Sequence, residues 1–152
     1  MADFKLNYKE YKMKEYKFLI NDEENSESIA FIEKELDRYN NEFAEPYFHK
    51  KLNVLMKNED EIIGGLIGGT YWGWLYIDRF WIRKDFRKLG FGSKLLKMAE
   101  KEAMDRGCKN AHLDTHDFQA VEFYRKNGYK IVSKLEDLPK GFNKYLMKKI
   151  LH

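Results

Sequence analysis

Hydrophobic and polar residues alternate in some stretches of the chain and follow a helical period in others. Alternating stretches rich in aromatic and β-branched residues predict strands at 15–20, 52–56, 61–70, 74–82, 110–114, 129–135 and 143–150. Apolar residues at helical spacing predict helices over about 28–39 and after the 74–82 strand, and a third helix is predicted over about 117–126. Asn25 or Ser26 would cap the first helix and Asp117 the third. This order of elements predicts a mixed α/β fold with parallel and antiparallel strand pairs.

One long uncharged run, residues 62–77, is interpreted as two strands and not as a membrane helix. The run is shorter than the roughly 20 residues that a membrane helix needs, and it contains five glycines. Two strands joined by a turn near Gly69–Gly73 fit it better. No membrane partner is therefore expected.

The loop between the 74–82 strand and the next helix has the features of an anion site. Gly90 and Gly92 allow a tight turn that exposes backbone N–H groups. The unpaired N–H groups and positive dipole of a first helical turn, with Arg87 and Lys88 beside them, suit a phosphate or pyrophosphate. The nucleoside-triphosphate loop is absent, and Leu95 stands where a dinucleotide motif needs its third glycine.

Two motifs, in this order and spacing, resemble those of the GCN5-related N-acetyltransferase (GNAT) family. Residues 87–92 match its Gln/Arg-x-x-Gly-x-Gly/Ala motif, which binds pyrophosphate at the start of a helix. Residues 123–129, about 35 residues downstream, look like its Phe-Tyr-x-x-x-Gly-Phe/Tyr segment. The chain thus resembles a small bacterial member of the family, with only a loose match over its first fifty residues.

The resemblance implies a single domain over residues 1–152, built on a twisted mixed sheet of six to seven strands with flanking helices. Two central strands, at 74–83 and 109–115, would splay apart and leave a gap for the pantetheine arm of acetyl-CoA, the expected co-substrate. Because many members pair through edge or C-terminal strands, the resemblance also favours a homodimer.

Two sets of residues would then hold the cofactor. Backbone groups of Phe80, Trp81 and Ile82 would pair with the pantetheine amides, and an N–H near Phe80 would stabilise the thioester oxyanion, worth ~3–4 kcal/mol. The pyrophosphate would be bound chiefly by backbone N–H groups of the loop, from Arg87, Lys88, Gly90, Phe91, Gly92 and Ser93.

Acetyl transfer to an amine also needs a base. A lysine-like amine has a pKa of ~10.4, so the neutral form at pH 7 costs about 4–5 kcal/mol unless a base or a desolvating pocket assists. Asp78 is the leading candidate, acting through water as acidic residues at this place in several family members are thought to do. The alternative is a strand-end aspartate paired with Arg79. His112 and His116 are rival bases, because a histidine pKa lies near neutrality.

The departing thiolate needs an acid. Tyr124 matches the family tyrosine that points at the cofactor sulfur and protonates it. The alternative is a core tyrosine whose hydroxyl is satisfied elsewhere.

Aromatic residues gather just before Asp78, at Tyr71, Trp72, Trp74 and Tyr76. Such residues commonly belong to the core or to a sheet surface. If some of them line the acceptor site, they favour an apolar, aromatic or cationic amine.

Composition narrows the functional classes further. The 152 residues are 43% hydrophobic and 16% aromatic, which indicates one globular domain. The net charge is only +3, from 28 basic and 25 acidic side chains, so no nucleic-acid partner is expected. The cluster Lys5, Lys9, Lys12, Lys14 and Lys17 is interpreted as a solvated surface.

The single cysteine, Cys108, excludes an internal disulfide and a cysteine-based zinc site, and is expected to be a buried structural thiol. No other metal site is predicted. The amino terminus shows no secretory signal, so a cytoplasmic location is expected.

Three functions follow from these features. The first is an acetyl-CoA-dependent N-acetyltransferase that acts on a primary amine of a small molecule by direct attack in a ternary complex. The second uses the same fold and cofactor to acetylate a protein lysine or amino terminus. The third is a non-catalytic module that binds acyl-CoA or nucleic acid.

Overall fold

The structure is a computed structural model that describes residues 9–13, 16–22 and 26–152. The chain forms two compact units, Met1–Pro46 and Tyr47–His152. The single domain expected over residues 1–152 stays a prediction.

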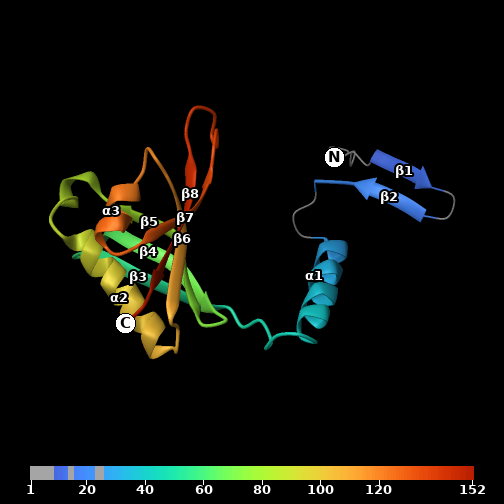
Figure 1. The fold of residues 1–152 in the computed structure, drawn as a ribbon, viewed down its shortest axis with the longest axis horizontal. Coiled ribbons are helices and arrows are strands. Elements are labelled where there is room, and N and C mark those ends of the chain that lie inside the picture. Colours follow the sequence, from blue (N-terminus) through green and yellow to red (C-terminus); the bar gives the residue numbers. More distant parts are fainter. Residues whose placement is uncertain (1–8, 14–15, 23–25) are drawn as a thin grey trace. The chain divides into compact units, whose positions relative to one another are not determined.

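The first unit contains a hairpin and a helix (Figure 1). Strand β1 (Lys9–Met13) pairs antiparallel with β2 (Tyr16–Ile20), and helix α1 (Glu27–Asn40) follows. The Ser26 side chain accepts a hydrogen bond from the Ile29 N–H at 3.3 Å, which identifies Ser26 as the cap. The predicted strand and helix are confirmed here, whereas Lys5, Lys14 and Asn25 lie outside the described residues.

The second unit is built on a six-stranded mixed sheet, which confirms the predicted fold class. Its strands are β3 (Lys50–Asn58), β4 (Glu61–Tyr71), β5 (Trp74–Ile82), β6 (Asn110–His116), β7 (Lys130–Leu135) and β8 (Lys144–Ile150). The spatial order is β3-β4-β5-β6-β8-β7. The β5–β6 pair is parallel and the other pairs are antiparallel.

Helix α2 (Phe91–Asp105) covers one face of this sheet, because its apolar residues repeat at helical spacing. Leu96, Ala99 and Ala103 of α2 are buried in one cluster with Leu75 of β5 and Leu113 of β6. Burial of a leucine side chain contributes about 1.5–3 kcal/mol, so this cluster fixes α2 against the two central strands.

A two-residue turn joins β4 to β5. Trp72 and Gly73 have φ values of 44° and 73°, as a tight hairpin turn requires. The turn is therefore narrower than the predicted 69–73, and Gly69 belongs to β4. A Cβ at Gly69 would collide with the His49 ring, which lies directly against it.

The predicted start of the third helix is wrong. Helix α3 spans only Val121–Lys126 and begins after Ala120. Asp117 does not cap it, because its carboxylate accepts hydrogen bonds from the backbone and side-chain nitrogens of Asn143, each at 2.9 Å. Residues before Val121 instead form a turn that is tied to the start of β8.

The central strands diverge as expected. Strands β5 and β6 pair only over residues 74–77 and 110–113. Beyond Ile77, β5 stays paired with β4, and beyond Leu113, β6 stays paired with β8. The sheet is thus open on one side of β5, where a short 3-10 turn (Lys84–Phe86) leads into α2. In the part of the chain that the structure describes, no helix is long and apolar enough to cross a membrane.

Candidate active site

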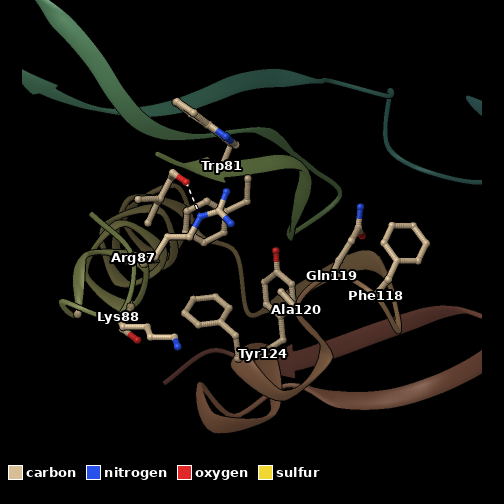
Figure 2. A pocket seen from close by; sticks show the side chains of 13 residues that line it. Trp81, Arg87, Lys88, Phe118, Gln119, Ala120 and Tyr124 are labelled. Carbon is tan, nitrogen blue, oxygen red and sulfur yellow. Dashed lines mark hydrogen bonds between the residues drawn. The ribbon is translucent and has the colours of Figure 1, made fainter. Parts of the chain in front are cut away.

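A cavity of about 590 Å³ lies where β5 and β6 separate. Figure 2 shows its walls, with Trp81 on the β5 side, Arg87 and Lys88 on the loop, and Tyr124 on α3. The residues assigned to the cofactor and to catalysis all line this cavity except Asp78 and Phe91, and the rival bases His112 and His116 also lie outside its lining. The structure therefore brings two distant motifs, the glycine loop and the α3 segment, to one place.

Two glycines shape the loop. Gly90 has a φ of 85°, which L side chains rarely adopt, and precedes the first residue of α2. A Cβ at Gly92 would lie 3.1 Å from the Phe123 ring, so the glycine lets α2 approach α3 closely. The space around Gly90 is open, so the missing side chain there leaves the backbone accessible to a ligand.

The start of α2 supplies free donors. The Lys94 N–H bonds to the Gly90 carbonyl at 3.1 Å and is the first helical bond of α2. The N–H groups of the three preceding residues lie in the first turn, where a helix offers no partner for them. Phe91 is the first of these, and its ring packs against Phe86 outside the cavity lining, with centroids 6.4 Å apart.

Two basic residues stand beside these donors. Arg87 is tied to the end of β5, because its Nε donates to the Ile82 carbonyl at 2.8 Å (Figure 2). Lys88 has a φ of 63°, a strained value for a residue other than glycine. Cations and unpaired N–H groups at a helix start are suited to an anion.

A β-bulge places Asp78 in β5. Ile67 of β4 pairs with Arg79 and Gly68 pairs with Ile77, so Asp78 is the extra residue between them. The bulge changes which residues of β5 face the core. Before the bulge the odd-numbered Ile77 faces the buried core, and after it the even-numbered Phe80 and Ile82 lie on that same side of the strand.

Trp81 alternates to the other side of β5, and its side chain is half exposed. It therefore borders the cavity mainly with its backbone. Because β6 has already separated from β5 here, the edge of β5 between Phe80 and Ile82 has no neighbouring strand in the described structure on its β6 side.

Asp78 is exposed and lies beside Tyr76, outside the cavity lining. Its carboxylate accepts a long hydrogen bond of 3.4 Å from the Tyr76 hydroxyl and pairs with the Arg79 Nε at 3.3 Å. The predicted pairing with Arg79 is thus present. An exposed ion pair of this kind contributes little, so it leaves the carboxylate available for another role.

Tyr124 projects its hydroxyl into the cavity from α3 (Figure 2). The residue is only 6% exposed, and its ring packs edge-on against Phe123 and Tyr129 at centroid distances of 5.1 and 5.7 Å. Burial raises the pKa of Tyr124 to about 12, so the phenol remains protonated at neutral pH. A protonated hydroxyl in a cavity is suited to donate a proton.

The two histidines occupy different environments. His112 on β6 forms a 2.7 Å hydrogen bond through Nε2 with the Tyr71 hydroxyl, and its ring stacks on Tyr76 at 4.9 Å. Desolvation lowers the pKa of His112, and the nearby Asp114 carboxylate partly opposes this. The ring is therefore neutral at pH 7 and can accept a proton.

His116 lies at the turn before α3. Its Nδ1 is 3.2 Å from the Gln119 Oε1, which also accepts a bond from the His116 backbone N–H at 3.0 Å. The His116 ring stacks on Phe118 at 5.1 Å. These contacts are those of a residue that shapes the turn.

The predicted aromatic residues are brought together on the sheet. Tyr71, Trp72, Trp74 and Tyr76 join His112 and two residues before β3 in one aromatic cluster, comprising Tyr47, His49, Tyr71, Trp72, Trp74, Tyr76 and His112. Tyr76 connects this cluster to Asp78.

Four cavity residues were not predicted from the sequence as site residues: Phe118, Gln119, Ala120 and Phe123. Phe123 could have been predicted as a site residue, because it is the first residue of the second family motif. The other three lie in the turn before α3, whose position depends on distant contacts with β8.

Cys108 is buried as predicted, and its burial raises the pKa of the thiol. Among the described residues, no group of three or more histidine, cysteine or acidic side chains could hold a metal ion.

Comparison with known proteins gives the site its context. The Acetyltransferase (GNAT) family matches residues 16–129. Blasticidin-S acetyltransferase of Streptomyces morookaense is 38% identical over 92 residues, covering 60% of this chain and 68% of that protein. An acetyltransferase of Agrobacterium fabrum is 34% identical over 125 residues, covering 82% and 91%. The crystal structure of an acetyltransferase from Bacillus cereus has a TM-score of 0.77 and 34% identity, covering 86% of this chain and 98% of that one.

The family match includes the cavity, the glycine loop and the whole of α3. The relatives from Agrobacterium fabrum and Bacillus cereus, both 34% identical, carry the match across most of both chains. GNAT acetyltransferases take the acetyl group from acetyl-CoA, so acetyl-CoA is the co-substrate here. The chain belongs to the GNAT family and is an acetyl-CoA-dependent N-acetyltransferase.

Proposed function

We propose that this acetyltransferase acetylates a primary amine of a small molecule by direct attack in a ternary complex. The observation that carries the proposal is the cavity between β5 and β6, which has an anion-binding loop at one side and the protonated Tyr124 hydroxyl at another. An elongated anionic thioester fits such a space, because its diphosphate needs hydrogen-bond donors and positive charge, whereas its sulfur needs a proton donor.

The loop residues are assigned to the pyrophosphate. Backbone N–H groups of Gly90, Phe91, Gly92 and Ser93 would donate to it, with Arg87 and Lys88 adding positive charge. The open edge of β5 over Phe80–Ile82 is assigned to the pantetheine amides. Pairing of this kind explains why Trp81 borders the cavity with its backbone while its ring points elsewhere.

Two side chains would then handle the protons of the reaction. The lone pair of a neutral amine attacks the thioester carbonyl, the C–N bond forms, and the C–S bond breaks. The leaving thiolate takes the proton of the Tyr124 hydroxyl, and the phenolate is reprotonated from solvent. The proton lost by the amine passes to Asp78 through water. His112 is the rival base, since its neutral ring belongs to the aromatic cluster that Tyr76 links to Asp78.

A small acceptor is favoured by the relatives and by the aromatic cluster. One relative over 30% identical is named for its action on blasticidin S. The rings beside Asp78 would contact an apolar, aromatic or cationic amine through stacking and cation–π attraction.

The test is a screen of amines by release of free thiol from acetyl-CoA. Small aromatic and cationic amines should release thiol with saturation kinetics, while lysine-containing peptides and peptide amino termini should not. Acetylation of peptides alone would favour the protein-directed alternative. If no small amine supports thiol release above hydrolysis, the proposed direct attack by a small-molecule amine is wrong.

A further inference from the structure

A second hollow adjoins the cavity along the exposed face of α2. Its volume is about 470 Å³, and it is lined by Gly90, Ser93, Lys94, Lys97, Met98 and Lys101. We call it the lysine hollow. Gly90 and Ser93 also line the cavity, so a ligand on the loop can extend directly into the lysine hollow.

The lysine hollow concentrates positive charge. Lys94, Lys97 and Lys101 stand three and four residues apart, which places them on one side of the helix. Lys101 pairs with Asp105 at 2.7 Å. Within the described ranges, no carboxylate pairs with Lys94 or Lys97. Unpaired like charges at this spacing disfavour one another, and a bound anion would offset that repulsion.

Coenzyme A carries a second anionic group that the loop does not accommodate. Besides its pyrophosphate, it has a phosphate monoester on the 3′-hydroxyl of the ribose, with a charge of about −1.5 to −2 at pH 7. One ribose separates this monoester from the pyrophosphate, so a ligand whose pyrophosphate lies on the α2 start could place it in the lysine hollow, which shares Gly90 and Ser93 with the cavity. The lysine hollow offers the positive charge that such a group requires.

We propose that the lysine hollow binds the 3′-phosphorylated adenosine end of the cofactor, with Lys94 and Lys97 on the phosphate and Met98 against the base. The proposal rests on the assignment of the pyrophosphate to the glycine loop. Met98 is half exposed and flexible, and suits contact with a flat ring.

A competing position exists on the other side of the loop. A hollow of about 600 Å³ along α3 shares Arg87 and Lys88 with the cavity and includes Arg125. Arg125 is already paired with Glu122 at 2.8 Å, and Asp117 also lines this hollow. The carboxylates of Glu122 and Asp117 would repel a phosphate in this hollow. The lysine hollow is therefore the more favourable of the two positions.

The experiment compares coenzyme A with 3′-dephospho-coenzyme A by isothermal titration calorimetry. The wild-type protein should bind coenzyme A about 10-fold or more tightly than the dephospho form. In the double variant Lys94→Ala/Lys97→Ala this ratio should fall to about 1–2, while affinity for the dephospho form changes less than about 2-fold. The matched control Arg125→Ala, in the competing hollow, should keep the wild-type ratio.

Salt provides a second readout. Wild-type affinity for coenzyme A should fall more steeply with ionic strength than affinity for the dephospho form, and the double variant should remove the difference. Lys94→Arg/Lys97→Arg should retain the ratio, and equal melting temperatures would show that the variants are folded.

Two results would overturn the proposal: an unchanged ratio in the double alanine variant, or loss of the ratio in Arg125→Ala. A failure of the loop assignment itself has a different signature. In that case 3′-dephospho-coenzyme A would bind Gly90→Glu as tightly as it binds the wild-type protein.

Discussion

Tyr124 owes its protonation state to its surroundings. Burial penalises the phenolate and raises the pKa to about 12, so the residue holds its proton throughout the range in which an amine of pKa ~10.4 becomes neutral. The same side chain therefore serves as an acid at every pH at which the nucleophile is available.

Replacement of Tyr124 by phenylalanine tests this role. Tyr124→Phe should lower kcat by about 100-fold or more, since general acid catalysis commonly contributes that much. The KM for acetyl-CoA should change little, because the ring and its packing remain. The matched control is Tyr129→Phe, which removes a hydroxyl from another buried tyrosine outside the cavity lining and should keep kcat. Equal losses in both variants would contradict an acid role for Tyr124.

Asp78 allows a test by pH. Asp78→Asn should lower kcat/KM by about 100-fold at pH 7, where the amine is protonated and needs a base. The deficit should shrink as pH rises towards the amine pKa, because solvent then removes the proton. The measurement is a pH profile of thiol release for wild type, Asp78→Asn and His112→Gln. If His112→Gln shows the pH-dependent deficit and Asp78→Asn does not, His112 is the base.

At the scale of single elements, the bulge in β5 decides which residues face the cavity. If β5 alternated regularly through Asp78, without the bulge, Arg79 and Trp81 would lie on the buried side with Ile77, and Phe80 and Ile82 would face the other way. One additional residue thus places apolar side chains against α2 and α3, and puts a carboxylate beside Tyr76.

The loop before α2 carries strain that can be measured. Lys88 has a φ of 63°, which costs a residue with a Cβ about 1 kcal/mol. Lys88→Gly and Lys88→Ala remove the same charge, but only glycine relieves the backbone. Urea unfolding should therefore give Lys88→Gly a free energy of unfolding about 0.5–1 kcal/mol above that of Lys88→Ala, after allowance for glycine's greater freedom in the unfolded chain. Equal values would show that the loop has another conformation in solution.

Local sequence patterns were sufficient for most elements. Alternation and helical period are short-range signals, and they predicted β5 and α2. The anion site that the paired glycines indicate stays a prediction. The start of α3 was mispredicted because Asp117 has the chemistry of a cap, yet Asn143, 26 residues away, takes its carboxylate. The bulge at Asp78 was missed for the same reason: it is defined by pairing with β4 and not by the residues of β5.

At the scale of the whole molecule, the family match extends over residues 16–129 and so includes parts of both compact units. The cavity itself belongs wholly to the second unit, which supplies every residue that lines it. Homodimer formation and a cytoplasmic location stay predictions.

Cofactor binding should stabilise the molecule as a whole. At 100 times its Kd, acetyl-CoA would add about 2.7 kcal/mol, which raises the melting temperature of a chain of this size by about 5–10 °C. NAD and ATP should give no comparable shift.

A pair of glycine variants tests whether this stabilisation comes from binding at the glycine loop. Gly90→Glu should abolish the shift, because a carboxylate would occupy the place of the pyrophosphate. Gly141→Glu is the matched control: both glycines have a φ near 80° and open space around them, but Gly141 lies in the turn between β7 and β8. It should lose stability and keep the full shift. If both variants keep the shift, the pyrophosphate does not lie on this loop.

The bulge has a further consequence for proton traffic. The Tyr124 hydroxyl belongs to the side of β5 that packs against α2, whereas the Asp78 carboxylate lies with Tyr76 on the opposite side. If these groups act as proposed, the acceptor loses its proton on one side of β5 and the leaving thiolate gains one on the other. The hydrogen of the new thiol then comes from Tyr124 and is not the one that the acceptor has just lost.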